Sequence, residues 1–199
     1  MADQTFTSGQ ILTAAQMTTL QSNTGLVVMT PTSVSGTGVT LSGNTMVVTA
    51  ASTASIIGCF TSTFTNYAVV YNFTAVSNYM RFKVRTASAD ISTGYGTTMA
   101  AITDNSTALS FLNAGATNFN DTKWLLTNNA VSFGVVQVFN PQLAANTFFD
   151  NNGTSIASTN SFKYFGGGRN TGTDVCTGLT LFPDSGTFTG TVTVYGYRL

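Results

Sequence analysis

Seven scattered Asp residues are the main candidates for acid–base or metal chemistry in this chain, because it has no His, no Glu and no Cys-x-x-Cys motif. Asp150 and Asp174 could each belong to a carboxylate pair of the kind that cleaves glycosidic bonds, if the fold brings two carboxylates together. Most of the Asp residues lie instead in turn-like sequences, where the side chain hydrogen-bonds the backbone. We therefore expect no catalytic residue and no enzymatic activity.

Two further segments resemble ligand-binding loops but lack the required spacing. The glycine-rich run GGGRNTG at 166–172 lacks the Gly-Lys-Ser/Thr ending of a phosphate-binding loop, and no helix pattern follows it. The sequence DNNG at 150–153 lacks the spacing of a calcium loop, which places Gly at its sixth position. We expect a flexible loop at the first segment and a hairpin connection at the second. No cofactor and no metal ion are expected.

The most unusual charge pattern is the sequence MRFKVR, in which Arg81, Lys83 and Arg85 alternate with apolar residues. A strand would place these three cations on one face. Such a face could be solvated, or it could pair with Asp residues across strands or subunits. It could also contact an anionic surface of a partner. The sequence leaves these alternatives open.

Low charge characterises the whole chain, since only 7% of its 199 residues are charged, against about 25% usually, and the net charge is zero. We expect no nucleic-acid partner because the basic and acidic residues balance to a net charge of zero. We expect no membrane insertion because no apolar run of about 18 residues is present. The opening residues, MADQTFT, lack the basic and apolar regions of a signal peptide. Cys59 and Cys176 are therefore expected to be buried free thiols, as in a cytosolic protein.

One helix start stands out, close to the N-terminus. The sequence TAAQ at 13–16 fits the capping box, in which the Thr and Gln side chains each bond the other residue's backbone N–H. A helix from about 14 to 22 would carry Leu12, Met17 and Leu20 on an apolar stripe. So short a helix is marginal in water, so the stripe must dock on something. We predict that residues 1–25 form an attachment segment that contacts symmetry mates or a larger assembly; the alternative is packing on its own β-domain.

From residue 26 onward, short runs with a period of two are bounded by Gly, Asn, Asp and Ser, a pattern typical of β-strands. This many short strands favours one all-β domain over 26–199, an antiparallel, jelly-roll-like β-sandwich preceded by the one short α-helix. Residues 87–122 are the least regular and are expected to form long exposed loops. The predicted strands are 26–30, 38–42, 45–50, 56–61, 67–74, 79–86, 123–127, 132–139, 145–149, 154–165, 177–182 and 187–197.

Two of these strands carry more specific predictions. The sequence VSFGVVQVF has Phe133, Val135 and Phe139 on one face and Val136 and Val138 on the other, which predicts a central strand covered on both sides. The last strand alternates Val with Thr and Tyr, so its two faces should lie in different environments. The sequence PDSG at 183–186 is a type I turn signal before that strand.

The order of several segments resembles a family of short bacteriophage virion proteins known as tail or minor tail proteins. The opening FTSGQILTAAQMTTLQSN is similar to their N-terminal attachment segment, and CFTSTFTNYAVVYNF is similar to a pattern in the middle of the family. The segments VQVFNPQLAANTFF and GLTLFPDSGTFTGTVTVYGYRL resemble the way in which these proteins end. The resemblance spans nearly the whole chain, and its terminal block is the most specific part.

This resemblance implies a β-sandwich that is often trimeric and is displayed on the virion, with no established catalytic residues. We therefore predict a homotrimeric tail fibre or appendage protein, assembled in the host cytoplasm, that contacts other virion proteins and a host-surface glycan. Loops from 87–122 and 166–174 are expected to bind the glycan through residues such as Tyr95 and Arg169, with Trp124 nearby. The alternatives are a capsid decoration or head-fibre protein of the same fold, a polysaccharide depolymerase, and a carbohydrate-binding module.

Overall fold

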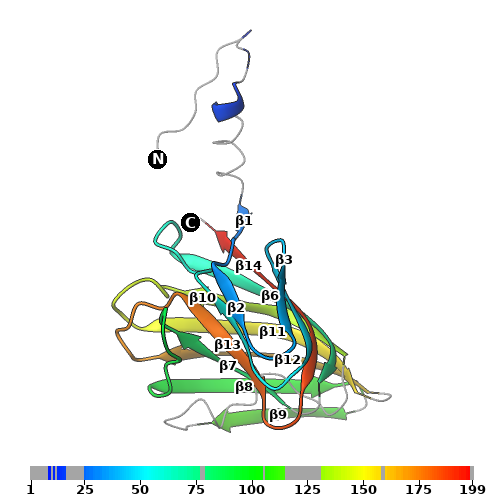
Figure 1. Ribbon diagram of the computed structural model, residues 1–199. Coiled ribbons are helices and arrows are strands. Elements are labelled where there is room, and N and C mark those ends of the chain that lie inside the picture. The colour runs from blue at the N-terminus through cyan, green and yellow to red at the C-terminus, as the bar shows by residue number, and fades with distance from the viewer. Residues whose placement is uncertain are drawn as a thin grey trace.

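The computed structural model describes residues 9, 11, 13–16, 25–76, 79–104, 106–114, 131–157 and 160–197. Within these ranges the chain is almost entirely β-strand, and its strands form two antiparallel sheets that pack against each other (Figure 1). The predicted all-β sandwich is therefore confirmed. No helix in the described ranges is long and apolar enough to cross a membrane.

The larger sheet has 10 strands in the order β3-β4-β14-β6-β10-β11-β12-β8-β9, with β1 also paired to β14. These strands are β1 (Leu26–Val28), β3 (Val39–Ser42), β4 (Thr45–Ala51), β6 (Asn66–Val76), β8 (Tyr95–Thr103), β9 (Ser106–Ala114), β10 (Val131–Phe139), β11 (Thr147–Ala157), β12 (Asn160–Asn170) and β14 (Phe188–Tyr197). The smaller sheet has the order β2-β5-β13-β7, with β2 (Ser33–Ser35), β5 (Ala54–Ile57), β13 (Gly178–Pro183) and β7 (Met80–Arg85). Because the chain passes between the two sheets several times, the sheets form one folding unit.

The core lies between the sheets and consists of side chains that point inward from alternate strand positions. On β14, Phe188, Val192 and Val194 are at most 1% exposed. The Thr and Tyr residues between them are half-buried, which confirms the two environments predicted for this strand. Aromatic rings join the layers, since Phe82 of β7 packs edge-on against Phe149 of β11 with ring centroids 5.3 Å apart.

Strand β10 is central, with β6 on one side and β11 on the other, but only one of its faces is covered. Val136 and Val138 point into the core and are 7% and 0% exposed, whereas Phe133 on the opposite face is 54% exposed. The prediction of burial on both faces is wrong for the single chain. A period of two shows which residues share a face, but it does not show how many layers the sheet has.

The described part of residues 87–122, which is 87–104 and 106–114, does not form the long loops that we predicted. It contains β8 and β9, and β8 pairs with β12 along its whole length. The prediction missed these strands because their sequences are built largely of Thr, Ser and Ala, whose alternation shows little contrast between apolar and polar positions. Residues 115–130, which include the predicted strand 123–127 and Trp124, lie outside the described residues.

The DNNG sequence does not form the predicted hairpin, because it lies inside β11, which pairs continuously with both β10 and β12. Asn151 within it is fully buried. Gly153 is required here, since a Cβ atom would overlap the Tyr71 hydroxyl and the Tyr164 ring. The glycines at 166–168 likewise lie in β12, so the prediction of a flexible loop there is also wrong. In both places cross-strand pairing overrides local turn preference.

The capping box near the N-terminus is confirmed. The Thr13 N–H donates to Gln16 Oε1 at 2.9 Å, and the Gln16 N–H donates to Thr13 Oγ1 at 3.3 Å. Helical backbone is described for residues 14–16. Leu12, Met17 and Leu20 lie outside the described residues, so their contacts stay a prediction.

Candidate functional site

The three cations of β7 lie on the outer face of the smaller sheet, and two of them are paired with Asp. Arg81 Nε forms an ion pair with Asp184, which directly follows β13. Arg85 Nε lies 3.4 Å from Asp90 Oδ1. The Lys83 ammonium lies 5.2 Å from the centre of a Phe ring on β13, a cation–π contact. Pairing with Asp, one of the alternatives that the sequence left open, therefore describes two of the three cations.

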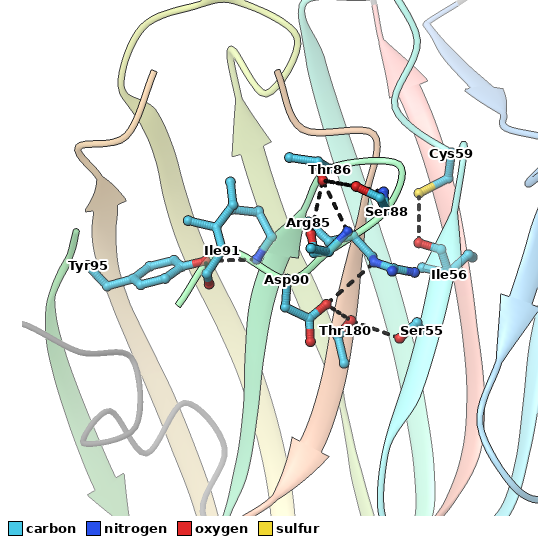
Figure 2. A network of polar contacts seen from close by, with 12 residues as sticks. Ser55, Ile56, Cys59, Arg85, Thr86, Ser88, Asp90, Ile91, Tyr95 and Thr180 are labelled. Atoms are coloured by element: carbon cyan, nitrogen blue, oxygen red, sulfur yellow. Dashed lines mark hydrogen bonds and ion pairs between the residues drawn. The ribbon is translucent and has the colours of Figure 1, made fainter. Parts of the chain in front are cut away.

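Asp90 is at the centre of a polar network that covers part of this face (Figure 2). Thr180 Oγ1 donates to Asp90 Oδ1 at 2.6 Å, and the hydroxyl oxygens of Ser55 and Thr180 are 2.8 Å apart. The chain after β7 folds back, and the Thr86 hydroxyl accepts a backbone N–H from three residues along at 3.1 Å. Thr180 is only 1% exposed, whereas the Asp90 side chain is 35% exposed, so the network is buried at Thr180 and open to water at Asp90. The charge of Arg85 is thus balanced within the protein.

Tyr95, which we predicted in a glycan-binding loop, belongs to the core and is 3% exposed. Its hydroxyl donates to the Ile91 carbonyl at 3.0 Å and accepts the Val84 N–H at 3.0 Å. Burial raises the pKa of Tyr95 well above its usual value. A buried ring with its hydroxyl already bonded offers a ligand nothing to contact, so this prediction is wrong.

The two thiols are buried and free, as predicted. Burial raises the pKa of the Cys59 thiol from 9.0 to about 12, and that of Cys176 to about 11. Both are therefore protonated at neutral pH, where a nucleophile or a metal ligand needs a thiolate. Asp150 is exposed on β11, and Asp174 is exposed in the connection between β12 and β13. Nowhere in the described ranges do three His, Cys, Asp or Glu side chains gather around a possible metal position.

The outer face of the larger sheet, which is turned away from the smaller sheet, gathers large apolar side chains that are between 41% and 54% exposed. These residues form the apolar patch: Val70, Ile102, Val131, Phe133, Ile156 and Phe165. They come from five neighbouring strands, and Val131, for example, lies directly opposite Ile156. A groove of about 570 Å³ among them is lined by residues that include Val70, Phe133 and Lys163.

A second hollow lies further along the same outer face, over β8, β11 and β12. It has a volume of about 340 Å³, and we name it the glycine groove after Gly96 and Gly167 in its lining. Phe148, Arg169 and Gly96 lie opposite one another on the three strands. Arg169 is exposed, as predicted, but on a strand rather than in a loop. Along β11, Phe148 in this groove is about 27 Å from Ile156 at the far end of the apolar patch, at about 3.4 Å per residue.

Sequence reasoning missed Phe148, and it included Gly96 and Gly167 only as unnamed members of the predicted binding loops 87–122 and 166–174. The signal that could have found the glycines is their position inside strands, where Gly weakens the sheet and often marks the close approach of a ligand. That signal becomes readable only when β8 and β12 are known to be strands. The apolar patch was missed because the prediction assumed that other strands of the same chain would cover this face of the sheet.

Comparison with known proteins finds no match to this chain among family models, curated proteins or solved structures. The resemblance to phage virion proteins therefore rests on the sequence segments described above and stays a prediction. Any function has to be argued from the outer face of the larger sheet and its chemistry.

Proposed function

We propose that this chain is a non-enzymatic structural protein of a bacteriophage virion, a homotrimeric tail fibre or appendage protein that presents its β-sandwich to the host surface. The observation that carries the proposal is the apolar patch on the outer face of the larger sheet. The sequence segments that resemble phage tail proteins support the assignment to a virion.

The apolar patch favours association with another protein surface. Monomeric soluble proteins rarely expose a large apolar patch without a function for it. Each of the six side chains is about half exposed, so complete burial would gain roughly 1 kcal/mol each, or roughly 6 kcal/mol per subunit. This gain is of the same order as the free-energy cost of association, which comes mainly from the lost translational and rotational freedom of the subunits. Identical copies carry identical patches, so a closed symmetric assembly covers all of them at once.

The charges of the chain support the same proposal. A net charge of zero gives little electrostatic repulsion between copies. On the outer face, Lys163 Nζ donates to Asn152 Oδ1, which holds its charge at the sheet surface. Asp90 and Asp184 balance arginines and so have structural roles, which accords with a protein that does no acid–base chemistry.

Light scattering on the purified full chain tests the assembly. We expect a mass of three 20.8 kDa chains at micromolar concentration. Phe133→Asp places a charge in the apolar patch and should shift the mass toward one chain. Leu143→Asp, at a similarly exposed apolar residue in the β10–β11 connection, is the matched control and should leave the trimer intact. A wild-type chain that is monomeric at this concentration overturns the trimer.

Labelling of virus particles tests the location. Particles purified from the source of this sequence should contain the chain when they are analysed by mass spectrometry. Gold-labelled antibodies against the chain should bind at the tail. Labelling spread over the capsid would replace the tail fibre with a decoration protein, and particles without the chain would overturn the virion proposal.

A further inference from the structure

Two glycines on the outer face of the larger sheet differ in how far the packing of the protein explains them. A Cβ atom at Gly96 would meet nothing within 4 Å, and one at Gly167 would meet only the Phe149 carbonyl oxygen, at 3.2 Å. Neither residue has a positive φ that would require glycine. Gly168 differs, since a Cβ there would crowd Thr97 at 2.6 Å. The contact at Gly167 is tight, so packing partly explains that glycine, but nothing in the protein explains Gly96. Glycine inside a strand weakens it relative to Ala, so Gly96 is best explained by something that lies on top of it.

The side chains around these glycines define the chemistry of the groove. Phe148 is 45% exposed and lies opposite Arg169, which in turn lies opposite Gly96. Thr98 is exposed and lies opposite Gly167, in the next row of the same face. The groove therefore has a bare backbone floor, with an aromatic ring, a guanidinium and a hydroxyl around it.

Arg169 is available for a ligand. Arg81 and Arg85 form ion pairs with Asp, whereas Arg169 forms no ion pair with any residue that the structure describes. Asp150 lies opposite Gly167 on the neighbouring strand, but it does not line the groove. The guanidinium thus presents its donors to the solvent at the edge of the hollow. Its planar fork of donors matches the two oxygens of a carboxylate.

We propose that the glycine groove binds a carboxylate-bearing sugar, a uronic or sialic acid, of a host-surface polysaccharide. The carboxylate pairs with Arg169, the apolar face of the sugar ring packs on Phe148, and the Thr98 hydroxyl and the backbone bond the ring hydroxyls. The volume of about 340 Å³ is at the small end of the range for ligand sites. A shallow site of this kind binds weakly, and several copies in one assembly raise the avidity. The source of the sugar rests on the proposed function; the binding itself does not.

Saturation-transfer NMR on the full chain tests the ligand class. Trigalacturonate and sialyllactose are the acidic probes, and the methyl ester of trigalacturonate and lactose are their neutral counterparts. We expect saturable binding of both acidic probes and binding of the neutral probes that is about tenfold weaker or more. Equal binding of acidic and neutral probes overturns the acidic class, and no saturable binding of either acidic probe overturns the site.

Two variants locate the binding in the groove. Arg169→Gln should weaken the acidic probes to the level of the neutral ones, and Gly96→Val should abolish binding of all of them because its side chain fills the hollow. A β-branched residue suits a strand, so G96V should melt at or above the wild-type temperature. Lys83→Gln removes a cation from the other sheet and should bind like wild type.

The remaining outcomes separate this proposal from the trimer. If G96V binds the acidic probes as wild type does, the groove is not the site. If G96V instead changes the mass in light scattering, a second copy of the chain covers the groove and the ligand proposal is wrong. If the wild-type chain is monomeric yet binds the acidic probes, the ligand proposal is supported and the proposed trimer is wrong.

Discussion

Single charged residues affect this protein strongly because they are few and partly buried. Arg81 and Asp184 are 14% and 18% exposed, so Asp184→Asn would leave the Arg81 charge without its partner in a poorly solvated position. Because both side chains keep some contact with water, we expect a loss of about 2 kcal/mol in the free energy of unfolding, less than for a fully buried pair. Urea unfolding measures it. Lys83→Gln is the control, with a change within about 0.5 kcal/mol, and equal midpoints for the two variants would contradict the argument.

Buried thiols and phenols make the stability sensitive to alkali. Burial raises the pKa of Cys59 from 9.0 to about 12 and that of Cys176 to about 11, and it also raises the pKa of Tyr71 and Tyr164. Below about pH 9 the folded and unfolded chains both keep these protons. Between about pH 9 and 12 the unfolded chain loses them first, so the free energy of unfolding falls as the pH rises.

Calorimetry across the pH range checks this window. The Tm should be nearly constant from about pH 7 to 8 and should fall steeply above about pH 9. Cys59→Ala removes one of the groups and should show a shallower fall. A Tm that holds to about pH 11 in the wild type would show that burial does not protect these protons.

The sequence predicted the alternation on β7 but not the partners of its cations. Period two was enough to place Arg81, Lys83 and Arg85 on one face, because side chains alternate along any strand. Asp90 and Asp184 lie in connections after β7 and β13, and the course of those connections depends on how the sheets pack. Tyr95 was misplaced for the same reason, since only the packing of β8 shows that its ring points into the core.

At the scale of elements, packing in the core explains why β11 is a strand, although its local sequence favours a turn. The Tyr71 hydroxyl donates to the Tyr164 hydroxyl at 3.3 Å beneath β11, and Gly153 leaves room for both rings. Gly153→Ala should therefore cost about 2 kcal/mol through overpacking. Gly96→Ala, where a Cβ meets nothing, should be neutral or stabilise by up to about 1 kcal/mol. Chemical unfolding compares the two, and a G153A variant as stable as G96A would count against the packing argument.

Strands with clear contrast between apolar and polar positions were predictable, and the others were not. Val192 and Val194 alternate with Thr and Tyr, so β14 was found with its correct faces. In β8 and β9 most residues are small and of intermediate polarity, so the same rule gave no signal. In β11 the DNNG sequence favours a turn in isolation, but ladders on both sides of the strand outweigh it.

The boundary of the sandwich at Leu26 gives a test of the N-terminal segment. Leu26 pairs with Tyr197 in the β1–β14 ladder, so deletion of residues 1–25 leaves every strand that the structure describes in place. By circular dichroism, we expect the truncated chain to melt within a few degrees of wild type. We also expect it to be absent from purified virus particles. Deletion of 1–29 also removes β1 and the Met29 N–H bond to the Val194 carbonyl, and it should melt clearly lower. If deletion of 1–25 unfolds the chain, the segment belongs to the core.

The whole molecule is an unequal sandwich, with a 10-stranded sheet facing a 4-stranded one. The smaller sheet covers only the inner face of the larger, and half-exposed apolar residues remain on the outer face. Sequence could establish the sandwich from the period of its strands. It could not show this imbalance, because a residue patterned for burial looks the same whether its cover comes from the chain itself or from another copy.

An interface built on the apolar patch should respond to salt as burial of apolar surface does, and not as ion pairing does. Only 7% of the residues are charged, so few ion pairs between subunits are available to be screened. Raising the salt shortens the Debye length from about 10 Å at 0.1 M to about 3 Å at 1 M and weakens exposed ion pairs. Burial of apolar surface is not weakened by this screening. We therefore expect light scattering to give the same trimer mass at about 0.1 M and about 1 M NaCl. Urea, which weakens apolar burial, should dissociate the trimer where salt does not. Dissociation by salt alone would mean that charged groups hold the subunits together and that the apolar patch is not the interface.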